Sequence, residues 1–196
     1  MIGVFGSERR NMNDILHFLK SRNSSPRLGE PAPTAAEMEE IFAAAMRAPD
    51  HAWLRPWRFI TISGDRREAL GEVLAQSLML RKPHADEAAR SKARNAPMRA
   101  PMLVVVVASL TEHPKVPHVE QRLSAGCAAQ GILLAAQALG YAGIWRTGDA
   151  AFDRTVMLAL GLGEHEEIVG FVYLGSRAGV AKPLPQLDTT EFVSSW

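Results

Sequence analysis

Cysteine is nearly missing from this sequence, since Cys127 is the only one in 196 residues. A single thiol excludes an intramolecular disulfide and a cysteine-based metal framework. The opening residues, M-I-G-V-F-G-S-E-R-R, also lack the apolar core and the cleavage site of a secretory signal. We therefore expect a protein of the reducing cytoplasm.

An excess of charge of either sign is absent as well. The chain has 22 basic and 21 acidic residues and a formal net charge of +1, so it has no overall attraction to nucleic acid or to a membrane surface. The longest apolar tract, residues 125–145, has membrane length but is largely alanine and glycine and contains Gln130 and Gln137. We predict a buried helix there. We expect a small-molecule partner and neither a nucleic-acid nor a membrane partner.

The signatures of several enzyme classes are missing too. The stretch G-L-G-E-H-E at 161–166 lacks the third glycine of a dinucleotide-binding loop, and no Walker motif occurs. His113 and His118 are five residues apart with two prolines between them, a poor arrangement for metal ligation. No serine lies in a G-x-S-x-G elbow. These absences disfavour P-loop enzymes, Rossmann dehydrogenases, metal centres and serine hydrolases.

Helical periodicity and capping patterns predict a series of helices. The first begins at Asn13 or Asp14. Capping boxes at Thr34 with Glu37 and at Asp65 with Glu68 begin the second and third. The second helix ends near Arg47. We predict further helices at 119–139 and near 153–160.

Short apolar or β-branched runs predict strands at 57–62, 102–108, 143–146 and 168–174. The run at 102–108 is apolar at every position, which is typical of a strand covered on both faces. Residues 81–100 are charged and weakly periodic, so we expect a mobile helix-and-loop excursion. The tail after Gly175 has little periodicity, but Phe192 and Trp196 suggest that it packs on something. The pattern predicts an α/β or α+β sandwich around one central sheet.

Arginine recurs in three clusters, namely Arg22 with Arg27, Arg47 with Arg55, and Arg146. Arginine pairs well with phosphate oxygens, and aromatic residues stand beside the later two clusters. A phosphate attached to a flat, electron-poor ring would use such a set, which favours flavin mononucleotide. Plainer interpretations remain open: a solvated turn at 22–27, an aromatic plug in the loop at 46–57, and a core tryptophan beside a surface arginine at 145–146.

Several motifs, taken in order, resemble the FMN-dependent nitroreductases. They are R-x-S after an N-terminal helix, M-R-A-P-D-H-x-x-x-x-P-W-R-F, S-A-G-C-A, G-I-W-R-T-G and I-V-G-F-V-Y-L-G. The resemblance covers residues 13–196 as a single FMN-binding domain and leaves 1–12 as an N-terminal extension. It implies an α+β fold, a three-layer sandwich with a mostly antiparallel central sheet flanked by helices. It also implies an intertwined homodimer with FMN at the interface.

The resemblance further implies a set of cofactor-binding residues. Arg22, Asn23 and Ser24 would hold the phosphate and ribityl region, and Arg47 and His51 would contact the same flavin. The set is completed by Trp145, Arg146 and Thr147. The family often has R-R-S or R-H-S at the first motif, so Asn23 is a departure that bears on how firmly FMN is held.

The implied reaction is ping-pong hydride transfer from NAD(P)H through flavin N5 to nitroaromatic or quinone-like acceptors. The chemistry resides on the flavin, so we assign no catalytic side chain. Two alternatives stay open: a flavoenzyme of this fold with another acceptor, and a flavin-binding module with little turnover. Trp53, Leu54 and Arg55 are the residues that we expect to shape the acceptor pocket.

Overall fold

The computed structural model describes the backbone of residues 4–196 and the side chains from Met12 onward. Its strands are β1 (Leu28–Gly29), β2 (Trp57–Ser63), β3 (Met102–Ser109), β4 (Ala142–Arg146) and β5 (Glu166–Arg177). Its α-helices are α1 (Val4–Lys20), α2 (Ala35–Ala45), α3 (Arg66–Arg81), α4 (Glu87–Arg94), α5 (His118–Ala138) and α6 (Arg154–Ala159). Short 3₁₀ turns lie at His51–Trp53, Pro97–Arg99, Asp149–Phe152 and Thr189–Glu191.

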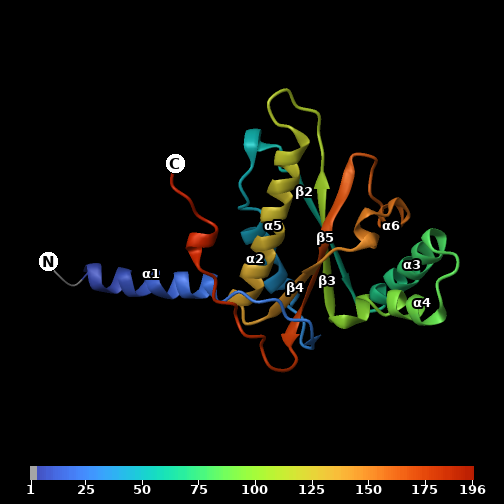
Figure 1. Cartoon of the computed structure of the whole chain (residues 1–196), viewed down its shortest axis with the longest axis horizontal. Coiled ribbons are helices and arrows are strands. Elements are labelled where there is room, and N and C mark those ends of the chain that lie inside the picture. The colour runs from blue at the N-terminus through green and yellow to red at the C-terminus, as the bar shows by residue number, and fades with distance from the viewer. Residues whose placement is uncertain (1–3) are drawn as a thin grey trace.

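The strands form one sheet in the order β1-β5-β3-β2, and β4 pairs with β5. Every strand pair is antiparallel. Helices cover both faces of the sheet: Figure 1 shows α2 and α5 on one side and α3, α4 and α6 on the other. The prediction of an α+β fold with a mostly antiparallel central sheet between helical layers is confirmed.

Strand β3 lies at the centre of this arrangement, and its residues from Leu103 to Ala108 are fully buried. Successive side chains on a strand point to opposite faces. Leu103 and Val105 accordingly pack with α3 and α6, whereas Val104 and Val106 pack with α2 and α5. This explains why the sequence of β3 is apolar at every position.

Helices α2 and α5 approach each other closely. A Cβ atom on Gly131 of α5 would lie 2.9 Å from the Cα of Ala45 of α2, so only glycine fits there without a shift. At the start of α2, the Thr34 side chain accepts from the Glu37 backbone, and the Glu37 carboxylate accepts from the Thr34 backbone. The capping box predicted there is confirmed.

An ion pair ties β2 to β5 across the central strand. The Arg58 guanidinium donates two hydrogen bonds to Glu166, at 2.8 and 2.7 Å, and Ser109 Oγ lies 2.9 Å from the same carboxylate. The hydrogen bonds from Arg58 outweigh the effect of burial and hold the pKa of Glu166 at about 2.

Three expectations about helices need correction or completion. Helix α1 begins at Val4 rather than at Asn13 or Asp14, and it crosses the expected boundary between residues 12 and 13 without a break. Asp65 precedes α3 in a helical conformation and makes no side-chain cap hydrogen bond, so the second capping box is wrong. The 81–100 excursion contains α4, which packs on α3 where Gly71 meets the Arg94 carbonyl.

The C-terminal tail after Arg177 is exposed, including Phe192 and Trp196. The expectation that these aromatics pack is therefore not met within this chain. Figure 1 shows that α1 extends away from the body and that the tail ends on the same side. Between Val4 and Trp196, no helix is both long enough and apolar enough to cross a membrane.

Candidate functional site

The first arginine motif lies beside the start of β4. Ser24 forms a parallel bridge with Gly143, and the Ser25 backbone N–H donates to the Gly143 carbonyl at 3.0 Å. Gly143 is itself closely packed on the core side, because a Cβ there would lie 2.7 Å from Leu133 Cδ2. The structure thus brings the R-N-S motif to G-I-W-R-T-G, although more than a hundred residues separate them in the sequence.

Arg22 and Asn23 have different surroundings in this turn. The Asn23 side-chain amide donates to the Lys182 carbonyl at 2.6 Å and so ties the turn to the C-terminal tail. Arg22 is half-buried. Within residues 12–196, whose side chains are described, it makes no ion pair. Arg22 thus remains available to an anion, while the Asn23 amide has a structural partner.

Trp145 and Arg146 project to opposite faces of the sheet, as adjacent strand residues do. The Trp145 indole packs with the α2 and α5 core and donates to the Val169 carbonyl at 3.3 Å. The Arg146 guanidinium lies on the other face, 5.7 Å from the centre of the Tyr173 ring. These two predicted site residues are therefore not brought together, and Trp145 is largely a core residue of this chain.

Arg146 and Thr147 line a hollow of about 370 Å³ on the α3 face, together with Arg99, Gly148 and Tyr173. The Arg146 Nε is buried and has no hydrogen-bond partner among the described residues. Burial raises the pKa of the Tyr173 phenol, and Arg146 and Arg99 oppose that rise. A buried donor without a partner is costly, so the hollow suits a ligand oxygen or ring nitrogen.

Sequence reasoning missed Arg99 and Tyr173. Arg99 follows a charged excursion whose path the sequence does not indicate, and Tyr173 sits inside an apolar strand. The strand alternation of β5 was the only available signal, because it places Tyr173 on the same face as Phe171.

The loop of residues 46–57 is anchored to the first part of α5. The Ser124 hydroxyl donates to the Pro49 carbonyl at 2.5 Å, and His51 Nδ1 lies 2.8 Å from Glu120 Oε2. His51 faces a hollow of about 400 Å³ that Cys127 also lines. Arg47 lines a different hollow. The two predicted flavin contacts from this loop, Arg47 and His51, therefore line two separate hollows.

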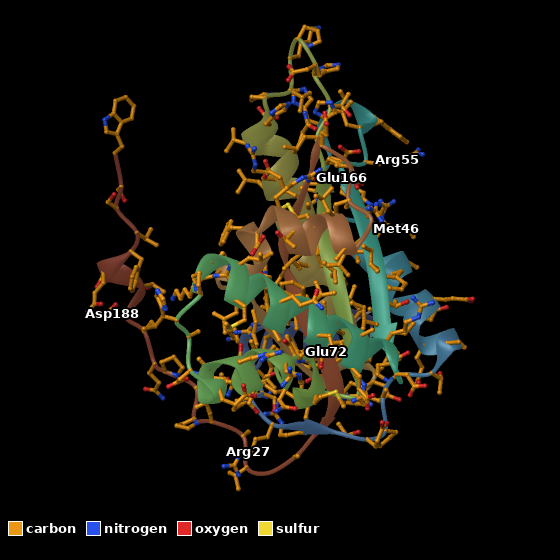
Figure 2. The ribbon with its side chains drawn as sticks, turned by 90° about the vertical axis from the view of Figure 1, so that its right-hand side faces the viewer. Arg27, Met46, Arg55, Glu72, Glu166 and Asp188 are labelled. Atoms are coloured by element: carbon orange, nitrogen blue, oxygen red, sulfur yellow. The ribbon has the colours of Figure 1, made fainter. Side chains whose placement is uncertain are left out.

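The two ends of the predicted site are far apart in one chain. Ser124 of α5 holds the loop of residues 46–57, whereas the Gln137 side-chain amide donates to Ser21 Oγ at 2.9 Å beside the first arginine motif. A helix rises about 1.5 Å per residue, so Gln137 lies about 20 Å further along α5 than Ser124. Figure 2 likewise shows Arg27 and Arg55 at opposite ends of the molecule. One chain therefore does not bring all eight predicted residues together.

Metal ligation has no obvious place in this arrangement. Among residues whose side chains are described, no group of three or more histidine, cysteine, aspartate or glutamate residues could hold an ion. The side chains around the two ends of the site include guanidinium, hydroxyl, amide and aromatic groups, and the Glu120 carboxylate there is paired with His51. Such groups suit an anionic, ring-bearing organic ligand.

Comparison with known proteins identifies a family. The profile described as "Nitroreductase family" matches residues 19–176. The Escherichia coli K12 protein named "Putative NAD(P)H nitroreductase YdjA" is 44% identical over 184 residues, which cover 92% of this chain and 98% of the relative.

Solved structures agree on the fold. A nitroreductase-like family protein from Bacillus cereus superposes with a TM-score of 0.79 at 21% identity, covering 93% of this chain and 95% of the other. A Bacteroides fragilis nitroreductase crystallised with bound FMN gives a TM-score of 0.69 at 22% identity, covering 93% and 98%. With the family profile and the 44% identity to the Escherichia coli relative, these matches show that the chain belongs to the nitroreductase family.

Proposed function

We propose that this protein is an FMN-dependent NAD(P)H oxidoreductase that passes a hydride through flavin N5 to nitroaromatic or quinone-like acceptors. One observation carries the proposal: the Arg22 turn adjoins the strand that ends at Arg146, whose buried Nε has no hydrogen-bond partner among residues 12–196. The names of the relatives support it, since one is called an NAD(P)H nitroreductase and another was crystallised with FMN.

The residues present fit FMN. Arg22 and Ser24 would hold the phosphate, because Arg22 makes no ion pair in the described part of the chain and the motif is fixed beside Gly143. Strand residues advance by about 3.3 Å, so the residues from Gly143 to Arg146 span about 10 Å, a length that a ribityl chain can bridge. Arg146 and Thr147 would then lie beside the flavin ring.

We propose a homodimer as the working unit, with the loop that bears Arg47 and His51 supplied by the second chain. The separation of about 20 Å along α5 keeps that loop away from the Arg22 turn of its own chain. Exposed apolar side chains are available for the contact on two helices: Leu123 of α5 is 64% exposed, and Ile15 and Leu16 of α1 are about half exposed. Exposed apolar side chains in such numbers favour a protein partner.

When bound, FMN would accept a hydride from NAD(P)H and donate it to the acceptor. Arg146 and Arg99 would attract the negative charge of the reduced ring, and the Arg22 turn would keep the phosphate in place. Glu120 would orient His51 by accepting a hydrogen bond from its Nδ1–H group. We place this activity in the cytoplasm, in keeping with the single cysteine.

The visible spectrum of the purified protein tests this proposal. We expect yellow protein that releases about one FMN per chain, is bleached rapidly by NADH or NADPH without oxygen, and regains colour with a nitroaromatic or quinone. Colourless protein that cannot be reconstituted with FMN would rule the proposal out. Bound FMN that NAD(P)H bleaches only very slowly would instead identify a flavin-binding module.

A further inference from the structure

A separate hollow of about 530 Å³ lies between the end of α2 and the start of β2. Its walls include two tryptophans and three charged residues, namely Trp53, Trp57, Arg47, Arg55 and Asp50. Figure 2 shows the labelled Met46 and Arg55, one at each end of this loop, on the same side of the molecule. A hollow of this volume accommodates a small organic ligand.

The charge of this hollow is positive. The Arg55 guanidinium lies 5.8 Å from the centre of the Trp53 ring, and neither Arg47 nor Arg55 forms an ion pair with any carboxylate of residues 12–196. The one acidic residue, Asp50, uses Oδ2 to accept from the Arg55 backbone N–H at 2.9 Å. Asp50 thus fixes the loop while both guanidinium groups stay available.

The loop holds these side chains in an unfavourable backbone conformation. Ala52, Trp53 and Arg55 have φ angles of 60°, 57° and 49°, in the left-handed region that favours glycine. Such strain persists only where surrounding contacts enforce it, and it clusters at binding sites. Here it leaves the indole of Trp53 80% exposed beside Arg55. Folding alone gives no reason to expose an indole in this way.

We propose that this hollow binds a flat aromatic ring that carries an anionic group, with the ring against Trp53 and the anion at Arg55. The inference rests on the proposed function, because two ligands of that reaction have this chemistry. One is an aromatic acceptor with a carboxylate, and the other is the adenosine 2′-phosphate of NADPH. Arg47 belongs both to this hollow and to the proposed flavin contacts, so the hollow adjoins the place where the reaction would occur.

Calorimetric titration of the purified holoprotein with two pairs of probes tests the inference. The first pair is 4-nitrobenzoate and neutral 4-nitrobenzyl alcohol, and the second is adenosine 2′,5′-bisphosphate and adenosine 5′-monophosphate. In at least one pair, we expect the dissociation constant of the first member to be at least about tenfold lower than that of the second. A charge-assisted hydrogen bond to Arg55 accounts for a difference of this size. A preference in the first pair identifies the acceptor, and one in the second identifies NADPH.

Variants then connect the preference to the loop. Arg55→Gln should abolish the preference for the anionic probe. Arg55→Gly should abolish it too, and glycine adopts the positive φ of this position without strain. Misfolding therefore cannot account for both results. Trp53→Ala should weaken both members of the pair by about fivefold or more, because ring stacking is lost. Arg90→Gln, a surface change on α4, should alter nothing.

Two results would overturn the inference: equal affinities within both pairs in the wild-type protein, or a preference that survives both Arg55 substitutions. These titrations measure binding without turnover. Failure of hydride transfer would therefore refute the proposed function while leaving this binding test intact.

Discussion

The backbone of Gly170 in β5 lies directly against the indole of Trp145 in β4. A Cβ atom on Gly170 would overlap Trp145 Nε1, and a neighbouring Arg146 carbonyl oxygen would stand 3.0 Å away. The indole can donate to the Val169 carbonyl only because this position has no side chain. Gly170 therefore leaves room for Trp145 in the core, while strand alternation directs Arg146 to the opposite side of the sheet.

Substituting Gly170 with alanine should displace this indole. We expect a loss of about 1–3 kcal/mol in the free energy of unfolding, the usual effect of overpacking a core, together with a change in tryptophan fluorescence. Chemical denaturation measures the first and emission spectra the second. Gly163→Ala is the matched control, because its Cβ would make only ordinary contacts with Glu166. Equal effects of the two substitutions would contradict the assignment.

Substituting Leu123 with glutamate should separate the proposed dimer. A charge on the exposed apolar face of α5 opposes burial against a second chain, so we expect monomers that have also lost FMN. Light scattering after gel filtration measures the mass, and flavin absorbance measures the cofactor. Leu80→Glu places the same charge at an exposed leucine of α3, on the other face of the sheet, and should change neither. A Leu123→Glu monomer that keeps its full FMN content would contradict the shared site.

Substituting Arg22 with alanine should weaken FMN binding. A hydrogen bond to a charged group contributes about 1.5–3 kcal/mol, so the dissociation constant should rise by about tenfold or more. Fluorescence titration of apoprotein with FMN measures this change. Arg90→Ala removes a surface guanidinium from α4 and serves as the control. If Arg22→Ala binds FMN as tightly as the control, Arg22 does not hold the phosphate.

The Arg58 and Glu166 pair should make stability depend on acid pH. The folded pKa of Glu166 is about 2, below its ordinary value of 4.5, so the pair stabilises the protein fully above about pH 4.5 and loses this effect as the pH falls toward 2. Arg58 is 39% exposed, so we discount the contribution to about 1–2 kcal/mol. Glu166→Gln should therefore be less stable than wild type at pH 6 and nearly equal to it near pH 2. Denaturation curves at several pH values measure the difference, and Glu164→Gln, at an exposed position, should leave the pH dependence intact.

Local patterns predicted much of the fold because the interactions behind them are local. The capping box at Thr34 and Glu37 joins residues three apart, and β3 carries its two-sided burial in its own apolar sequence. Asp65 and Glu68 have the same spacing, yet Asp65 adopts a helical conformation that takes its side chain away from the cap. Spacing alone therefore identifies the start of a helix but not how it is capped.

The candidate site was only partly predictable. Successive side chains on a strand point to opposite faces, so Trp145 and Arg146 lie on different sides of the sheet. Sequence reasoning that treats them as one cluster because they are adjacent overlooks this. The pairing of His51 with Glu120 joins residues 69 apart, and the bridge between Ser24 and Gly143 joins still more distant ones. The first pair forms where α5 packs against the loop of residues 46–57 and the second where the Arg22 turn meets β4, and no short-range pattern records either contact.

The length of α5 has a genetic consequence. If one chain supplies the Arg22 turn and its partner the loop with His51, a chain damaged at Arg22 and a chain damaged at His51 can rescue each other. A mixed dimer would contain one site with both defects and one with neither, so random pairing of equal amounts would restore about a quarter of all sites in a twofold-symmetric assembly. Two alleles that each give an inactive protein by itself would then yield an active enzyme when they are expressed together.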